Sequence, residues 1–117
     1  MNPGFKFDCI FYYVSDLDHS IDFYSRVLDL HLTSRDAVAR FHIDGVLFEL
    51  VPTEDISLFS GKGNARLTLA VDDIHAARTK LLEKGVSVSE IQTVSNGLLA
   101  KFTDPDSNEI VLWQYAV

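Results

Sequence analysis

The stretch that decides the fold is Ile10-Phe11-Tyr12-Tyr13-Val14-Ser15-Asp16-Leu17, because the chain repeats its pattern once. The second copy is Leu67-Thr68-Leu69-Ala70-Val71-Asp72-Asp73-Ile74, and 57 residues separate each position from its counterpart. Both copies are apolar, strand-like runs that end in Val and lead through acidic residues into an amphipathic helical pattern. A repeat this long holds several elements, so the sequence predicts two copies of one small module.

The first module should begin with a strand over residues 5–14, which are rich in aromatic residues. Ser15 or Asp16 can cap the following helix. One face of that helix recurs at three- and four-residue steps, and we expect the helix to end near Asp29. The residues on this face are Leu17, Ile21, Tyr24 and Leu28. Residues 30–43 fit two short strands with a break near 34–36.

Asp44-Gly45 is the strongest local signal, because Asp-Gly between alternating runs is typical of a type I′ hairpin turn. If these two residues form the turn, Phe41 opposes Phe48 and Arg40 opposes Glu49. Opposed residues share a face. One face is then wholly apolar and should pack on the helix: Ala39, Phe41, Ile43, Val46, Phe48 and Leu50. The other face is mixed and should meet ligand or solvent: Val38, Arg40, His42, Leu47, Glu49 and Val51.

The second module repeats this order. A strand at about 64–71 precedes a helix that Asp72 or Asp73 can cap and that Gly85 should end. Strands near 86–92, 97–103 and 109–115 follow, with a turn at Asp104-Pro105-Asp106-Ser107-Asn108 before the last one. The buried face of the helix should carry Ile74, Ala77, Leu81 and Leu82. We therefore predict an α+β fold, with module 1 at about 5–52, a connector at 53–63 and module 2 at about 64–117.

Composition bounds the class of protein. The 117 residues are 47% hydrophobic and 23% charged, which suits one globular domain whose halves would be marginal alone. A net charge of −7 lacks the basic stripe that nucleic acid or an anionic membrane requires. The acidity favours either simple solubility or a cationic ligand. A lone Cys9 cannot form an internal disulfide, and no apolar leader or membrane span is visible, so we expect the cytoplasm.

At three places the sequence resembles the vicinal oxygen chelate superfamily, which includes glyoxalase I, extradiol dioxygenases, fosfomycin-modifying enzymes and bleomycin-resistance proteins. These places are residues 14–24 with Leu28, residues 47–51, and residues 102–110. The resemblance implies two βαβββ modules whose mixed sheets curl around a cavity, with helices on the outer face and commonly in a homodimer. It implies less about activity, because one fold hosts many functions.

In metal-dependent members of that family, the first and last strands of each module supply four ligands, mostly His and Glu. The resemblance places Cys9, Glu49, Arg66 and Val111 at these positions. Valine cannot ligate, and a protonated arginine repels a cation. We therefore expect neither a metal nor another cofactor. An unusual site that recruits His42 or Cys9 with Glu49 is the alternative, although a metal needs several ligands at fixed distances.

A buried Glu49 would need a partner, and Arg40 and Arg66 are the candidates. A Glu49–Arg ion pair would be structural and link the walls of the cavity. Alternatively, one of the arginines would bind an anionic or carbonyl group of a ligand. Alternation places aromatic side chains beside these charges, where they would be ligand-binding residues, plain core or dimer interface. The candidate ligand-binding residues are Phe11, Tyr13, Arg40, His42, Glu49, Arg66, Thr68, Trp113 and Tyr115. Cys9 is expected to be an inert thiol.

The resemblance and these residues favour a metal-independent small-molecule binding protein. It would hold an aromatic or cationic, antibiotic-like ligand, as bleomycin-resistance proteins sequester drugs. Arg40, Arg66 and Lys101 conflict with an exclusively cationic ligand. An enzyme is the alternative, a lyase, isomerase or glutathione-linked enzyme with Glu49 as base, although an arginine-bound carboxylate is a weak base. A third possibility is an interaction module whose cavity is filled by its own side chains.

Overall fold

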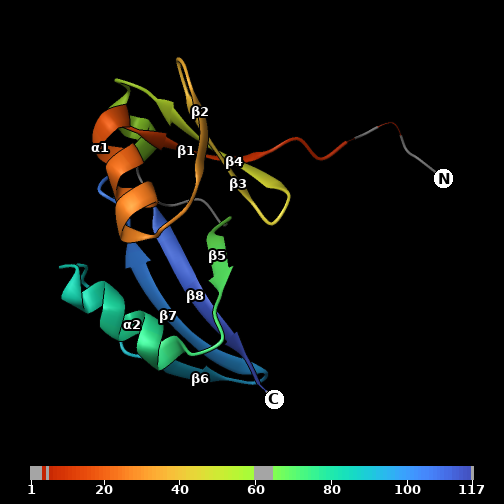
Figure 1. Ribbon diagram of the computed structural model, residues 1–117, viewed down its shortest axis with the longest axis vertical. Coiled ribbons are helices and arrows are strands. Elements are labelled where there is room, and N and C mark those ends of the chain that lie inside the picture. Colours follow the sequence, from red (N-terminus) through yellow and green to blue (C-terminus); the bar gives the residue numbers. More distant parts are fainter. Residues whose placement is uncertain (1–3, 5, 60–64, 117) are drawn as a thin grey trace. The chain divides into compact units, whose positions relative to one another are not determined.

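The computed structural model describes residue 4 and residues 6–59 and 65–116 (Figure 1). The chain divides into two compact units, Met1–Leu58 and Phe59–Val117, hereafter module 1 and module 2. Each unit contains one four-stranded mixed sheet and a helix that lies on it. The predicted α+β class and the order of strand, helix and three strands in each module are confirmed.

Module 1 builds its sheet in the order β1-β4-β3-β2, with β1 parallel to β4 and the other pairs antiparallel. Helix α1 continues into a π-helical segment, η1, and a 3₁₀ turn, η2, follows the last strand. The elements are β1 (Ile10–Val14), α1 (Leu17–Asp22), η1 (Phe23–Val27), β2 (Leu32–Arg35), β3 (Ala39–Ile43) and β4 (Val46–Pro52), and η2 (Ile56–Phe59) spans the boundary between the two modules.

The β3–β4 hairpin has the predicted register. Asp44 and Gly45 have φ values of 50° and 82°, the two positive angles that a type I′ turn requires. Phe41 pairs with Phe48, and Arg40 pairs with Glu49. The turn chemistry therefore fixes which side chains of both strands face the helix.

The core of module 1 is a cluster of three aromatic rings that are at most 1% exposed. The Tyr24 ring lies 5.2 Å from Phe48 and 6.1 Å from Phe41, measured between centroids. Fully burying such a side chain contributes roughly 1.5–3 kcal/mol. The apolar face expected of the hairpin is buried at Ala39 and Leu50 as well, while Val46 beside the turn is 38% exposed.

The first helical segment begins at a side-chain N-cap and ends at a residue with left-handed backbone angles. Asp16, rather than Ser15, is the N-cap, and its carboxylate accepts a hydrogen bond from the backbone N–H of His19 at 3.0 Å. Asp29 ends the helical segment with φ of 57°, as expected from the sequence. In the π-helical segment, Leu28 N–H donates to the carbonyl of Phe23, five residues back.

The predicted first strand is too long, since β1 begins at Ile10 and residues 6–9 before it are not strand, while residue 5 lies outside the described residues. Its parallel partner explains the difference. Ile10 pairs with Phe48, so residues before Asp8 would need partners in or beyond the Asp44-Gly45 turn, where β4 has not begun. Phe7 is accordingly 69% exposed.

Module 2 repeats the topology in the order β5-β8-β7-β6, with β5 parallel to β8. Helix α2 packs on one face of β7 and β8 (Figure 1). The elements are β5 (Leu67–Ala70), α2 (Ile74–Glu83), β6 (Gln92–Val94), β7 (Gly97–Thr103) and β8 (Glu109–Tyr115). The strands expected at 97–103 and 109–115 are thus confirmed. Residues 65, 66 and 71 of the strand predicted at 64–71 lie outside β5, and residue 64 lies outside the described residues.

Helix α2 is fixed at its N-terminus from two sides. Asp73, rather than Asp72, is the N-cap and accepts from the backbone N–H of Ala76 at 3.1 Å. The side-chain oxygen of Gln114 on β8 accepts from the backbone N–H of Ile74 at 2.8 Å. Two of the first-turn N–H groups, which have no partner inside a helix, are thereby satisfied.

Two predictions in module 2 are wrong. Residues 86–91 form no strand, because Arg78 of α2 donates to the backbone oxygens of Ser89 at 2.8 Å and Val88 at 3.4 Å. Those two carbonyls accept from a guanidinium, and the backbone bond from Ser89 N–H to the Lys101 oxygen on β7 does not extend into a ladder. Leu82 is 43% exposed instead of buried, since Ile74 and Leu81 define the face of α2 that meets the sheet.

The turn between β7 and β8 is organised by a buried carboxylate. Asp104 is 4% exposed and accepts from the backbone N–H groups of Asp106 and Asn108, each at 2.9 Å. Its second oxygen accepts from the Asn108 side-chain amide, also at 2.9 Å. This network sets the β7–β8 register that places the module 2 residues considered below.

Candidate functional site

Each sheet has one face that its own helix leaves uncovered, here called the helix-free face. Alternation along the strands assigns the side chains to it, and the buried residues of β4 and β8 lie on the opposite face. In module 1 this face carries Phe11, Tyr13, Arg40, His42, Leu47, Glu49 and Val51. In module 2 it carries Thr68, Ala70, Gly97, Leu99, Lys101, Glu109, Val111, Trp113 and Tyr115. All nine candidate ligand-binding residues lie on these two faces or, for Arg66, just before β5.

A polar cluster on module 1 is centred on Glu49, whose side chain is 19% exposed. Arg40 Nε donates to Glu49 Oε2 at 3.2 Å, which confirms the cross-strand pair expected from the hairpin register. The Cys9 thiol donates to Glu49 Oε1 at 3.8 Å. Glu49 is therefore held from two directions by groups of its own module.

Cys9 stays a thiol in this cluster. Partial burial, and then the negative charges of Glu49 and Asp8, raise the pKa of the Cys9 thiol above its ordinary value of 9.0. A raised pKa leaves little thiolate at neutral pH, and the thiolate is both the nucleophile and the metal ligand. The cluster does not prepare Cys9 for either role.

Arg40 forms ion pairs with two carboxylates, those of Glu49 and Asp36. Its Nη1 donates to Asp36 Oδ2 at 3.1 Å, and the hydrogen bond to Asp36 is the largest cause that raises the pKa of Arg40. The pKa of Asp36 is lowered in turn, first by the backbone N–H of Val38 and then by Arg40. Arg40 is therefore a structural cation between two acids rather than an open anion-binding group.

His42 lies on the same face, diagonal to Glu49 in the β3–β4 register, but its hydrogen-bond partner is Thr33. Its Nδ1 is 3.1 Å from the hydroxyl of Thr33, which also donates to the backbone oxygen of Arg40 at 3.0 Å. His42 is exposed, as the mixed face of the hairpin predicts. The contact with Thr33 gives the imidazole a defined neighbour on strand β2.

Aromatic pairs flank the charged groups on both modules. Phe11 and Tyr13 on β1 meet edge to face, with centroids 5.2 Å apart and planes at 86°. Trp113 and Tyr115 on β8 do the same at 5.5 Å and 89°. Edge-to-face pairing is a favourable geometry that holds both rings in place. Each module thus presents a pair of contacting aromatic rings on its helix-free face.

Arg66 forms an ion pair that the sequence did not suggest. Its Nε donates to Glu109 Oε1 at 3.0 Å, and the two side chains are 29% and 32% exposed. The register explains the contact, because Thr68 pairs with Val111 and Arg66 and Glu109 each lie two residues earlier. Parallel pairing of the two strands, applied at the sequence level, could have found it.

Gly97 was also missed, although it determines how Trp113 packs. A Cβ added at Gly97 would lie 2.7 Å and 2.9 Å from the Cζ2 and Cη2 atoms of Trp113, and closer still to the Gln114 carbonyl oxygen. Cβ atoms essentially never approach this closely. The hairpin register, which pairs Gly97 with Tyr115, was the available signal.

The residues at the family's metal positions do not fit a metal ion. Module 1 offers a protonated thiol at Cys9 and a carboxylate, Glu49, that Arg40 already neutralises. Module 2 offers the cationic Arg66 and the apolar Val111. Across the described residues, no three His, Cys, Asp or Glu side chains are grouped so that they could hold a metal.

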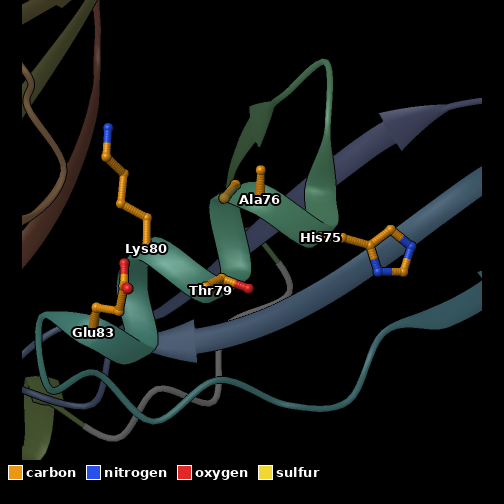
Figure 2. Close-up of a pocket in the computed structure, with 6 residues that line it drawn as sticks. His75, Ala76, Thr79, Lys80 and Glu83 are labelled. Atoms are coloured by element: carbon orange, nitrogen blue, oxygen red, sulfur yellow. The ribbon is translucent and has the colours of Figure 1, made fainter.

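One depression lies on the exposed surface of helix α2, which covers the other face of the module 2 sheet. Figure 2 shows its lining, with His75 near the N-terminal end of the helix and Lys80 and Glu83 toward its C-terminal end. Ala76, Ala77 and Thr79 complete it. All six residues come from one helix, and the groove is open, so it offers no converging polar groups for a ligand.

Comparison with known proteins decides the family. The model of the Glyoxalase/Bleomycin resistance protein/Dioxygenase superfamily matches residues 6–112. The chain belongs to this superfamily. The resemblance seen in the sequence is thereby confirmed. A search of curated proteins finds no match.

Several solved structures resemble this superfamily member over nearly its full length. TnmS3, an antibiotic binding protein from Streptomyces sp. CB03234, is 25% identical with a TM-score of 0.84 and covers 99% of this chain and 100% of its own. A glyoxalase/bleomycin resistance protein from the same Streptomyces is 29% identical with a TM-score of 0.70, covering 92% and 99%. Lactoylglutathione lyase from Agrobacterium tumefaciens, at 16% identity, a TM-score of 0.77 and coverage of 97% and 96%, shares the fold.

Within the part of the chain that the structure describes, no helix combines the length and the apolar character needed to cross a membrane.

Proposed function

We propose that this chain is a metal-independent small-molecule binding protein of the glyoxalase/bleomycin-resistance type. It holds an organic ligand, aromatic or cationic and antibiotic-like, in an aromatic-walled cleft. It acts as a cytoplasmic homodimer that uses no cofactor and binds neither nucleic acid nor a membrane. The net charge of −7 supports the last point, because phosphate surfaces repel an acidic protein.

The observation that carries the proposal is that contacting aromatic rings and ion-paired charges lie together on the helix-free faces. Phe11 and Tyr13 lie beside the Glu49–Arg40 pair, and Trp113 and Tyr115 share the face that carries Glu109, the partner of Arg66. Aromatic surfaces with a few placed polar groups are typical of small-molecule sites. The relatives add support, since TnmS3 is an antibiotic binding protein.

An enzyme of the same superfamily, a lyase or isomerase with Glu49 as base, is supported less well. A general base must be able to take a proton from substrate. Glu49 Oε2 already accepts from Arg40 and Oε1 from the Cys9 thiol, so both carboxylate oxygens are engaged within the module. Catalysis would require the carboxylate to leave these partners.

A thermal-shift experiment tests the proposal, because a ligand that binds the native state raises the melting temperature by mass action. The chain is titrated with divalent metals and, separately, with a panel of aromatic and cationic drugs. We expect stabilisation by at least one drug, its loss in Trp113→Ala, and no specific stabilisation by metals. Phe7→Ala, which removes an exposed aromatic that precedes strand β1, is the control.

Stabilisation by a metal that disappears in Glu49→Gln but persists in the exposed control Glu90→Gln would overturn the proposal. If no compound stabilises the chain, the interaction module becomes the better explanation. Sedimentation equilibrium tests the dimer, which should have twice the chain mass of 13.1 kDa.

A further inference from the structure

The Trp113 indole is seated on the backbone at Gly97. Gly97 pairs with Tyr115, and Leu99 pairs with Trp113, so all four share one face of the β7–β8 hairpin. The close approach of the ring leaves no room for a Cβ at residue 97. Tyr115 meets the same indole edge to face. The indole is therefore positioned before any ligand arrives, and it remains half-buried rather than covered.

A preformed aromatic surface of this kind favours flat ligands. Binding to a positioned ring avoids the entropy that is lost when a mobile side chain is ordered. Offset stacking of a planar group on an indole contributes roughly 0.5–1.5 kcal/mol beyond the area that it buries. The packing of the indole against the Gly97 backbone thus determines the plane in which a ligand can stack.

The charge beside this surface is positive. Lys101 pairs with Val111, which places it diagonally from Trp113 on the same face. Its exposed ammonium group makes no hydrogen bond or ion pair within the described parts of the chain. The carboxylate that the register brings equally near, Glu109, is already bound by Arg66. Module 2 therefore offers one unbalanced cation next to the indole.

We propose that Gly97, Lys101 and Trp113 form a subsite for a planar aromatic group that carries a carboxylate. The ring stacks on the indole, and the carboxylate pairs with the Lys101 ammonium. Diagonal neighbours on a sheet lie about 7–8 Å apart, a span that a two-ring aromatic acid covers. This inference rests on the proposed binding function and assigns the ligand chemistry of the module 2 face. It also accounts for the conflict between an acidic protein and the basic residues on its candidate site.

Isothermal titration calorimetry with three probes of one shape tests the subsite. The probes are 2-naphthoate, neutral 2-naphthalenemethanol and cationic 2-naphthylmethylammonium. We expect 2-naphthoate to bind the wild-type chain about 5–10-fold more tightly than the alcohol, as for a charge-assisted hydrogen bond at an exposed site. Lys101→Gln should abolish that preference, while Lys80→Gln on helix α2 should leave it unchanged.

The packing of Trp113 against Gly97 is tested by fluorescence, because Trp113 is the only tryptophan in the chain. Gly97→Ala should shift the emission to longer wavelength and weaken binding of all three probes about tenfold or more. If that variant does not fold, Trp113→Leu replaces it, with the same expected loss for every probe.

Equal affinity for 2-naphthoate and the alcohol in the wild-type chain would overturn the inference, as would a preference that survives Lys101→Gln. Unchanged emission and affinity in Gly97→Ala, or unchanged affinity in Trp113→Leu, would overturn the role of the seated indole. These failures differ from failure of the proposed function, in which no drug of the thermal-shift panel stabilises the wild-type chain.

Discussion

At the residue scale, the thiol of Cys9 should react slowly. Burial and the charges of Glu49 and Asp8 raise its pKa, so the thiolate fraction near pH 8 is smaller than in a free cysteine. The rate of alkylation by iodoacetamide, followed by mass spectrometry, should keep rising with pH beyond 9.0. Glu49→Gln removes one negative neighbour and should speed alkylation several-fold at pH 8.

The exposed Glu90→Gln variant is the control and should react like the wild-type chain. A rate that levels off below pH 9.0 would contradict the raised pKa. The raised pKa of Cys9 also makes the stability of the fold depend on pH. Because the folded thiol holds its proton longer than the unfolded one, its contribution to the free energy of unfolding is present below 9.0 and declines above it.

Ser20 provides a second prediction at this scale. It is 1% exposed, and its hydroxyl has no hydrogen-bond partner in the described part of the chain. Ser20→Ala removes this unsatisfied group and favours the helix, so we expect the free energy of unfolding to rise by about 1 kcal/mol. Chemical denaturation followed by circular dichroism measures the change.

Ser25 is the matched control for Ser20. Its hydroxyl donates to the backbone oxygen of Ile21 at 2.6 Å, so Ser25→Ala loses a hydrogen bond as it gains helix propensity. We expect no increase in stability from that variant. Equal stabilisation by both substitutions would show that helix propensity, rather than the unsatisfied hydroxyl, is responsible.

At the element scale, substitutions can distinguish Asp73, the N-cap of helix α2, from the adjacent Asp72. Asp73→Ala removes the acceptor for the backbone N–H of Ala76 and should lower the free energy of unfolding by about 1 kcal/mol. Asp72→Ala changes the adjacent exposed acid and should stay within about 0.5 kcal/mol of the wild-type chain. Urea denaturation of both variants measures the difference, and a larger loss from Asp72→Ala would reverse the assignment.

The elements that sequence reasoning predicted well are those whose signals are local. Asp44-Gly45 determines the β3–β4 register because its turn type leaves one pairing, and Asp29 ends a helix whose periodicity is clear. The strand expected at residues 86–91 is absent, and the carbonyls of Val88 and Ser89 accept instead from Arg78, ten and eleven positions earlier. No local pattern in an extended segment reveals that a helix side chain will compete for its backbone.

At the scale of the whole molecule, the same distinction applies to the candidate site. Alternation placed Phe11, Tyr13, Trp113 and Tyr115 on the right strands, and the hairpin placed Arg40 opposite Glu49. The Arg66–Glu109 pair required the register of two strands that are 43 residues apart. The repeat predicts two similar modules, but the charges on each module are set by pairings that differ between them.

The two modules should also depend on one chain for their stability. Each contains fewer than about 60 residues, a size at which the buried fraction of the surface is low and folding alone is marginal. We expect residues 1–58 and 59–117, expressed separately, to be largely unfolded by circular dichroism at 25 °C, while the full chain melts cooperatively. The full chain cut at the junction by an inserted protease site is the control for the loss of covalent connection alone. A cooperative thermal transition in either isolated module would show that the core of that module is sufficient for folding. Each substitution predicted above would then change the stability only of the module in which it lies.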